Sequence, residues 1–550
     1  MSPHTPAEPP PAASGAPAVP VAEEETLAEV LARVWPTVRQ RHLYPRLPPP
    51  RLGEPGGLAV LELTSRAIVL AERVARDLAR ELGPEAALTG LLDHAVGHYL
   101  YCPFDLATHL ALYGRAKAVL GEGAAARRAT DLFLDAVADT MVLSRLASPL
   151  PRVYALLPRD QAQEALLKAL EITWQKEMRA QGDPELARAV AGLPWLEKAR
   201  WPQTLERFCR LLESQLRGAG GEEGGAPALG AHSLSRYSPD QVRQGLGELA
   251  RRLADPPRFG EIVGDWSEEL AQAAGGQAPG LGLGAGAGPG GDNHTAAFYL
   301  ALAGEYALPL RRAPQELAGA AYPHHHRPWE LGGSWQDLDV WTSFGMIMPG
   351  ISQTWRRQEG RVFAPEARVP DCLIAIDSSG SMPHPGRVLS PAVLGAGAAA
   401  DAYLQNGARV AVVNFSDADR GGVLVQGYSP RREEVFQALA HYWGGGTRLR
   451  LADLDSLQLE PPPDLFLITD LEITNLTPLM SWLKASPNRV LAVHLAHNPQ
   501  ALAFRDGLDL SPHVTVQAVL APADIPALVL GRVRRNLGGD RRKPARAFSF

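Results

Sequence analysis

The sequence predicts a doubly wound, Rossmann-like α/β domain at residues 365–538, preceded by a mostly α-helical N-terminal region and Gly-rich linkers. From Pro370 onward, apolar runs typical of buried parallel strands alternate with helix-like segments. Between residues 24 and 216, apolar residues instead recur at three- and four-residue spacing, as in SRAIVLAERVARDLARELG, which is typical of packed helices. Stretches rich in glycine interrupt these patterns and indicate flexible links.

The expected order of segments follows from these changes in composition. It is a disordered Pro/Ala-rich lead (1–23), a helical domain (24–216), a flexible linker (217–232), a short helical segment (233–274), a Gly-rich linker (275–292), a Trp-rich connector (293–364), the α/β domain (365–538) and a basic tail (539–550). The Gly-rich linker is not expected to bind phosphate, because it has no GK[ST] ending and no strand leads into it. Tryptophans at the density of the connector usually pack a linker onto a domain surface.

Each element of the α/β domain has its own signal. Strands are expected at the apolar runs DCLIAIDSS, RVAVVNFS, GGVLVQGYS, DLFLITD, NRVLAVHLA and HVTVQAVL, the third at a sheet edge. Helices are expected at VLSPAVLGAGAAADAYLQNG, RREEVFQALAHYW, LTPLMSWLKAS and ADIPALVLGRVRRNL. In a doubly wound sheet, ligands bind beyond the carboxyl ends of the strands, so the loops that follow the strands are where chemistry is expected.

Composition excludes several classes of partner. Hydrophobic residues make up 45% of the chain and charged residues 21%, as in an ordinary soluble globular protein. The net charge of −6 gives no basic surface for nucleic acid or an anionic membrane. The three cysteines form no CxxC pair, which suits a reducing compartment. With no secretory signal and no long apolar run, we expect a cytoplasmic protein with neither a nucleic-acid nor a membrane partner.

Three loops near the predicted strand ends contain oxygen ligands. The first, Asp377-Ser378-Ser379-Gly380-Ser381, follows the strand DCLIAI in a DxSxS pattern. The second ends at Thr447 after three glycines, and the third begins at Asp470, where DLFLITD ends. A small hard cation such as Mg²⁺ prefers octahedral oxygen coordination, and two serines two residues apart on a tight turn can face one ion.

These residues, in this order and after these strands, resemble the metal-ion-dependent adhesion site of von Willebrand factor A (VWA) domains. The resemblance implies that Mg²⁺ or Mn²⁺ is held by Asp377, Ser379, Ser381, Thr447 and Asp470. It also implies a sixth coordination position for an acidic residue of a protein partner. The alternative is a serine turn that caps a helix without metal. No histidine is placed by sequence to activate either serine, so we expect a binding module without catalytic residues.

A second candidate site lies in the helical region. His94 and His98 are spaced to share one face of a helix, and Asp135 and Asp139 repeat this spacing on a later helix. The pair resembles a zincin metallopeptidase, but Ala95 stands where HExxH has its general base, so the domain resembles a degenerate peptidase. A metal-free polar network is the favoured interpretation. Bound zinc without hydrolysis is the second, and an active hydrolase is the third.

The combination resembles bacterial and archaeal VWA proteins that work with MoxR-type AAA+ ATPases. It implies an adaptor whose metal site binds an acidic residue of a partner, while the ATPase drives remodelling or maturation. The chain has no Walker motif, so ATP hydrolysis would come from the partner. Two alternatives are a zinc-dependent peptidase whose VWA domain recruits substrate, and an accessory or defence component that senses a partner.

Overall fold

The computed structural model describes residues 25–54, 59–62, 67–103, 105–218, 232, 234, 237–274, 292–306, 316–317, 321–359, 362–363, 369–494, 499–509, 511–519 and 521–537. They fall into two compact units, the first comprising residues up to 104 and 115–236, the second 105–114 and 237 onward. The predicted lead and basic tail lie outside the described residues, as do most residues of the two predicted linkers. No helix among the described residues combines the length and apolarity needed to cross a membrane.

The first unit is mainly helical. Its helices are α1 (Leu27–Arg41), α2 (Glu72–Leu82), α3 (Pro84–Leu100), the end of α4 (Leu106–Leu120), α5 (Gly123–Leu143), α6 (Leu150–Tyr154), α7 (Gln161–Trp174), α8 (Pro184–Ala191), α9 (Trp201–Leu211) and α10 (Glu213–Gly218). A three-stranded sheet in the order β1–β3–β2 joins them, with strands β1 (Arg51–Gly53), β2 (Ala59–Glu62) and β3 (Ala67–Ala71). The expectation of one continuous helix over SRAIVLAERVARDLARELG was therefore wrong, because its β-branched start forms β3 and only its amphipathic remainder forms α2.

Helix α3 lies at the centre of this unit and contacts α1, α2, α5 and α6. It is buried on nearly all sides from Ala87 to His98, as expected for a helix that is apolar around most of its circumference. Glycine permits its close approach to α5, because a Cβ atom at Gly97 would lie 2.8 Å from Val142 Cγ2. This contact brings the polar residues of α3 within reach of the acidic residues of α5.

After residues 105–114, which belong to α4, the second unit continues with four further helices and two small sheets. The helices are α11 (Pro239–Leu253), α12 (Pro256–Asp265), α13 (Ser267–Ala273) and α14 (Asp292–Tyr306). One sheet pairs β4 (Glu316–Leu317) with β8 (Val362–Phe363), and the other has the order β5 (Ala321–Pro328), β7 (Gln353–Glu359) and β6 (Leu338–Asp339). Helix α14 packs on α11 and α12 and on two helices of the α/β domain, so the predicted connector contains a packed helix.

A six-stranded, mostly parallel sheet forms the α/β domain, as the sequence predicts. The strands are β9 (Cys372–Asp377), β10 (Val410–Phe415), β11 (Val423–Ser429), β12 (Asp464–Thr469), β13 (Val490–His494) and β14 (Val514–Ala518). Their order is β11–β10–β9–β12–β13–β14, and only the edge strand β11 runs antiparallel to its neighbour. All six residues of β9, β10 and β12 are buried, which explains their continuous apolar runs.

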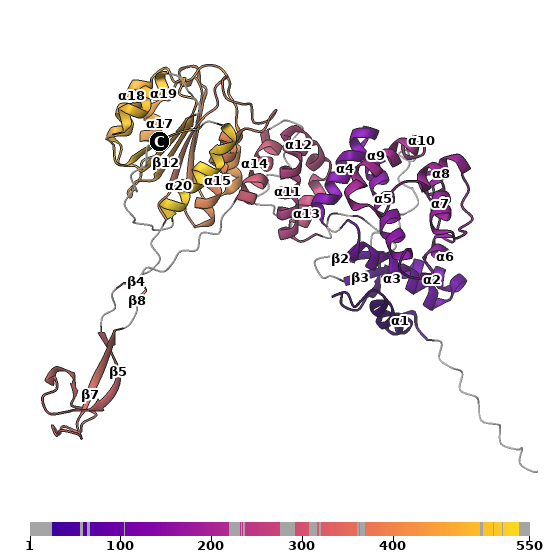
Figure 1. The fold of residues 1–550 in the computed structure, drawn as a ribbon, viewed down its shortest axis with the longest axis horizontal. Coiled ribbons are helices and arrows are strands. Elements are labelled where there is room, and N and C mark those ends of the chain that lie inside the picture. Colours follow the sequence, from indigo (N-terminus) through magenta and orange to yellow (C-terminus); the bar gives the residue numbers. More distant parts are fainter. Residues whose placement is uncertain are drawn as a thin grey trace, which may run out of the picture. The chain divides into compact units, whose positions relative to one another are not determined.

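Helices cover both faces of this sheet (Figure 1). Those of the domain are α15 (Pro391–Gln405), α16 (Arg432–Ala440), α17 (Leu451–Asp455), α18 (Leu476–Ala485), α19 (Pro499–Leu508) and α20 (Ile525–Leu537). Leu373 and Ala375 of β9 share one core cluster with residues of α17, α18 and α19. Helices α15, α16 and α20 contact the strands from the other side (Figure 1).

The strand order places a topological switch point between β9 and β12. The chain leaves β9 for β10 and β11 on one side, then returns to form β12 on the other. Strands β9 and β12 pair in parallel, with Ile376 opposite Ile468, so both strands end at the same edge. A crevice at such an edge is the usual ligand site of an open α/β sheet.

The contact between α15 and α20 gives a test of this packing. A Cβ atom at Gly395 of α15 would lie 2.6 Å from Ile525 Cγ2 and 3.5 Å from the Ile525 backbone. Because that branched side chain is stiff, Gly395→Ala should lower the free energy of unfolding of the domain by about 1–3 kcal/mol. Hydrogen–deuterium exchange of the β9 and β12 peptides in rising urea measures this loss.

The matched control is Gly531→Ala on α20, where a Cβ atom meets nothing within 4 Å. This substitution should stabilise the helix by about 0.5–1 kcal/mol, because alanine restricts the unfolded chain more than glycine does. If both variants changed the hydrogen-exchange protection of β9 equally, the packing of α15 on α20 would not require glycine at position 395.

Candidate metal centres

The two carboxylates of the predicted magnesium site lie at the edge where β9 and β12 end. Asp377 is the last residue of β9, and Asp470 directly follows the last residue of β12. Burial raises the pKa of Asp377, and the charge of nearby Asp470 adds to this effect. Parallel pairing of the strands thus accounts for their proximity.

Backbone hydrogen bonds join the DxSxS turn to the glycine loop that leads to Thr447. Gly380 N donates to the Gly445 carbonyl, and Gly444 N donates to the Ser378 carbonyl, each over 2.9 Å. A Cβ atom at Gly380 would lie 3.2 Å from the Gly445 oxygen, so the absence of a side chain permits this contact. The two loops are therefore held at fixed separation.

Thr447 is tied to the third loop as well. Its carbonyl accepts hydrogen bonds from Thr474 N (3.0 Å) and Thr474 Oγ1 (3.1 Å), and Thr474 lies four residues beyond Asp470. On the other side, Ser416 Oγ donates to the Gly446 carbonyl over 2.7 Å. All three loops that carry predicted ligands are thus connected through hydrogen bonds to the backbone.

The side chains of the DxSxS turn converge. Ser379 Oγ and Ser381 Oγ lie 3.1 Å apart. Asp377 Oδ1 accepts from Ser379 N (2.9 Å), and its Oδ2 accepts from Thr469 Oγ1 (2.7 Å). Asp470 Oδ1 accepts from Glu472 N over 2.9 Å, which fixes the turn after β12.

The electrostatics of this edge suit a hard cation. Asp377 is only 2% exposed, and burial raises its pKa to about 6 although Ser379 and Thr469 donate hydrogen bonds to it. These donors are neutral, so the buried carboxylate and nearby Asp470 leave negative charge that a cation would balance. Carboxylate and hydroxyl oxygens are the ligands that Mg²⁺ and Mn²⁺ prefer, so the donor set fits such an ion.

The edge is buried on the protein side and open to solvent on the other. Asp377, Ser379 and Thr447 are buried, whereas Ser381 and the neighbouring Gly445 are exposed. A partner side chain can therefore approach from the Ser381 side without rearrangement of the strands.

The second candidate centre lies between α3 and α5 of the first unit. His94, His98 and Asp135 are all buried, and their ligand atoms lie within 4.8 Å of one another, so this group could hold a metal ion. Asp139, the fourth residue predicted here, does not join this group. Its Oδ1 lies 2.8 Å from His94 Nδ1, so it orients His94 instead. The geometry is compatible with a bound metal ion as well as with the metal-free polar network favoured from the sequence.

His232 belongs to the same cluster, and the sequence analysis missed it. Its Nε2 lies 2.8 Å from Asp135 Oδ1, and its ring lies 4.6 Å from the ring of His98, centroid to centroid. His232 is 97 residues from Asp135 in the sequence. It is the last residue of the segment that was predicted to be a flexible linker. The one available signal was a lone histidine after a Gly-rich stretch, which no spacing rule connects with α3.

Opposing effects set the proton affinities of this cluster. Burial lowers the pKa of His94, but the Asp139 and Asp135 carboxylates outweigh it and raise the pKa overall. Burial and the neighbouring His94 lower the pKa of His98. Burial raises the pKa of Asp135, but the contacts with His232 and His98 outweigh it and keep this pKa well below its usual value. Asp135 is therefore an ionised carboxylate among imidazoles that compete for protons.

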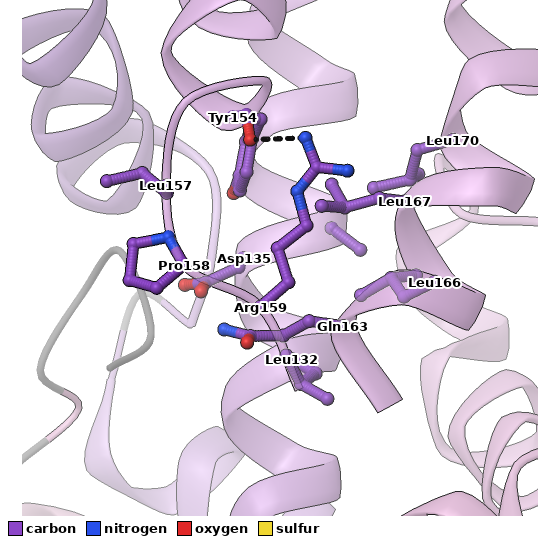
Figure 2. A pocket seen from close by; sticks show the side chains of 11 residues that line it. Leu132, Asp135, Tyr154, Leu157, Pro158, Arg159, Gln163, Leu166, Leu167 and Leu170 are labelled. Atoms are coloured by element: carbon purple, nitrogen blue, oxygen red, sulfur yellow. Dashed lines mark hydrogen bonds between the residues drawn. The ribbon is translucent and has the colours of Figure 1, made fainter. Parts of the chain in front are cut away.

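A small pocket adjoins the cluster (Figure 2). Asp135 lines it together with Tyr154, Arg159 and Gln163, and its volume is about 20 Å³. That volume accommodates about one water molecule. Arg159 Nη2 donates to the Tyr154 carbonyl over 2.9 Å (Figure 2).

No protein-family model and no curated protein sequence matches this chain. The assignment of both centres therefore depends on the positions of the chain's own residues.

Metal-dependent stability tests the centre at the sheet edge. After removal of bound metal with EDTA, Mg²⁺ or Mn²⁺ should raise the melting temperature of the α/β domain, and Asp377→Asn should abolish this shift. At an ion concentration 100 times Kd, the stabilisation would be about 2.7 kcal/mol, because the ion binds only the folded domain. Differential scanning calorimetry measures it.

Two controls accompany this measurement. Asp419 is an exposed carboxylate of the same domain that pairs with Arg448 (3.0 Å), so Asp419→Ala should retain the full shift. His94→Ala should retain it too, because His94 lies in the other unit. A wild-type domain that is indifferent to both ions would contradict the proposed donor set.

Proposed function

We propose that the C-terminal α/β unit is a VWA-type domain that binds a protein partner through a divalent cation. The ligands of Mg²⁺ or Mn²⁺ are the five residues predicted from the sequence: Asp377, Ser379, Ser381, Thr447 and Asp470. The observation that carries this proposal is the hydrogen-bonded convergence of their three loops at the switch point between β9 and β12. Such an arrangement places charged and hydroxyl oxygens where α/β sheets bind their ligands.

The residues of this site have different roles in the proposed binding. The DxSxS turn presents two hydroxyl oxygens, Thr447 would add a third, and Asp377 and Asp470 supply negative charge. A bound cation supplies an open coordination position for a carboxylate. Without an ion, Asp377 and Asp470 repel an incoming acidic side chain, so partner binding depends on the metal. The exposed side at Ser381 admits that side chain.

The hydroxyl groups of the turn are not placed for nucleophilic catalysis. Ser379 Oγ and Ser381 Oγ contact each other over 3.1 Å. The histidine nearest in sequence, His384, stacks on Tyr442 with ring centroids 4.3 Å apart, and its Nδ1 accepts from Gly386 N (3.1 Å). A serine nucleophile needs a base within hydrogen-bond distance, and His384 is engaged elsewhere. This supports a binding role for the edge.

The biological role proposed for this binding is that of an adaptor for a MoxR-type AAA+ ATPase. The resemblance in the DxSxS, Thr and Asp residues and the helical N-terminal region support it. In this proposal the metal site binds the partner's acidic residue, and the ATPase supplies the energy for remodelling or maturation. A sensor that binds a partner without any ATPase uses the same chemistry and is distinguished by the identity of the partner.

A zinc-dependent peptidase is the less favoured function. Ala95 occupies the position of the catalytic glutamate, so no carboxylate at that position can activate water. His94 and His98 are 0% and 7% exposed, and neither is among the residues that line the pocket beside Asp135. The pocket therefore gives a peptide bond no access to these histidines.

Comparative capture from the native host tests the adaptor proposal. The full chain in Mg²⁺ should retain an AAA+ ATPase, and EDTA should release it. The Asp377→Asn variant and a double variant, Ser379→Ala with Ser381→Ala, should lose at least about 10-fold in affinity, the effect of about 1.4 kcal/mol. Quantitative mass spectrometry followed by titration calorimetry with the purified ATPase measures the loss.

Asp419→Ala is the matched control and should bind as the wild type does. The partner's own acidic residue is found by replacing its exposed aspartates and glutamates with amides, and one such variant should reproduce the loss. Capture that is equal in Mg²⁺ and EDTA would contradict a metal-mediated contact. Metal-dependent capture of a protein without ATPase activity would favour the sensor.

A further inference from the structure

The neutral histidines of the cluster in the first unit have too few protons to donate a hydrogen bond at each of their contacts with oxygen atoms. His98 Nδ1 lies 2.8 Å from the Cys102 carbonyl oxygen, which can only accept, so Nδ1 must carry the proton. His98 Nε2 lies 3.2 Å from Asp135 Oδ1, which is also an acceptor. A neutral imidazole has one proton, so its Nε2 directs a lone pair at a carboxylate unless His98 becomes a buried cation.

His94 repeats this arrangement. Its Nδ1 lies 2.8 Å from Asp139 Oδ1 and donates to that carboxylate, whose other oxygen accepts from the Tyr154 hydroxyl. Its Nε2 then also presents a lone pair, 3.9 Å from Asp135 Oδ1, and it has no hydrogen-bond partner among the described residues. Leaving a fully buried nitrogen unpaired costs about 1–3 kcal/mol. Two imidazole lone pairs and a carboxylate thus face a common point.

The distances around Asp135 are compatible with ligands that share one ion. Asp135 Oδ1 lies 3.2 Å from His98 Nε2, 2.8 Å from His232 Nε2 and 3.9 Å from His94 Nε2. With metal–ligand bonds of 2.0–2.1 Å, ligand atoms of a tetrahedron are about 3.3 Å apart, so these three distances lie on both sides of the ideal value. The ligand atoms of His94, His98 and Asp135 lie within 4.8 Å of one another, and His232 joins this group through its contacts with Asp135 and His98.

We propose that His94, His98, His232 and Asp135 hold one Zn²⁺ ion in a closed site that stabilises the fold of the first unit. This inference is independent of the cation site in the α/β domain. Imidazole nitrogens with a single carboxylate favour zinc over Mg²⁺, which prefers oxygen ligands alone. Four protein ligands complete a tetrahedron, so no position remains for a catalytic water molecule.

Groups around the ligands support this role. Asp139 and the Cys102 carbonyl each accept a hydrogen bond from the Nδ1–H group of a proposed histidine ligand, which directs Nε2 at the ion. Three neutral imidazoles and Asp135 leave a net charge of +1 on a zinc centre, and Asp139 offsets it. All four ligands are buried, at 0–7% exposure, as in structural rather than catalytic sites.

The proposed ion would fix His232 to α3 and α5. His232 follows α10 in the chain and contacts Asp135 and His98. Metal binding that joins distant parts of the chain contributes directly to folding. Removal of the ion should therefore release His232 from α3 and α5 before the rest of the unit unfolds.

Metal analysis of the full chain, purified without a histidine tag and without chelator, tests the proposal. We expect one zinc per chain, and loss of most of it in His94→Ala and His232→Ala. Because these variants can fail to fold, Co²⁺ is added to stripped wild-type protein as a second measurement. Strong visible d–d bands of tetrahedral Co²⁺ support the four-ligand site, whereas the weak bands of octahedral Co²⁺ overturn it.

The controls separate ligands from other buried histidines. His42 is buried and lies 2.9 Å from Asp93 Oδ1 outside the cluster, so His42→Ala should keep one zinc. Asp139→Asn should keep the metal but weaken zinc affinity about 10- to 100-fold, as loss of an orienting partner does. Asp377→Asn should leave zinc unchanged, which distinguishes failure of this inference from failure of the proposed function.

Two further results would overturn the closed site. One is a wild-type chain that neither contains zinc nor takes up Zn²⁺ or Co²⁺ after stripping. The other is a folded His232→Ala variant with wild-type zinc affinity, since three remaining ligands would leave an open position. Faster hydrogen exchange around residue 232 after treatment with 1,10-phenanthroline would support the proposed stabilising role.

Discussion

The need to compensate buried carboxylates underlies both centres of this protein. An ion removed from water loses several kcal/mol of solvation, which other groups must restore. Asp377 receives hydrogen bonds from Ser379 and Thr469, yet burial still raises its pKa to about 6. Asp135 is surrounded by imidazoles and keeps a pKa below its usual value. Asp377 receives its hydrogen bonds from neutral donors, which do not balance its charge. Asp135 lies among imidazoles that have too few protons to donate a hydrogen bond at every contact.

Each centre is assembled by close backbone contacts rather than by residues adjacent in sequence. In the α/β domain, parallel pairing of β9 and β12 brings two carboxylates to one edge, and Gly380 lets the glycine loop contact the DxSxS turn. In the helical unit, Gly97 lets α3 approach α5. A side chain at either glycine would push apart the elements that carry the ligands, so these positions link packing with chemistry.

Sequence patterns predicted the helices and strands far better than the tertiary contacts between them. The buried strands and the loops with Asp377, Thr447 and Asp470 could be identified because parallel strands leave continuous apolar runs. The pair of His94 and His98 followed from helical spacing alone. His232 could not be assigned to them, because no periodicity relates residues 97 positions apart. The β3 strand was hidden because its apolar run continues into the pattern of α2, and only its β-branched residues distinguish it.

The difference in donor atoms explains why one chain would use two kinds of metal centre. Hydroxyl and carboxylate oxygens at a partly exposed edge suit an ion that exchanges and shares a coordination position with a partner. Imidazole nitrogens buried between helices suit an ion that stays bound, because unfolding must precede its release. If the two ions were interchanged, the ion at the exposed edge would dissociate too slowly for partner binding to be switched. The ion in the buried cluster would dissociate too readily to stabilise a fold. The placement of nitrogen donors inside and oxygen donors outside would therefore separate the proposed folding role from the proposed binding role within the same molecule.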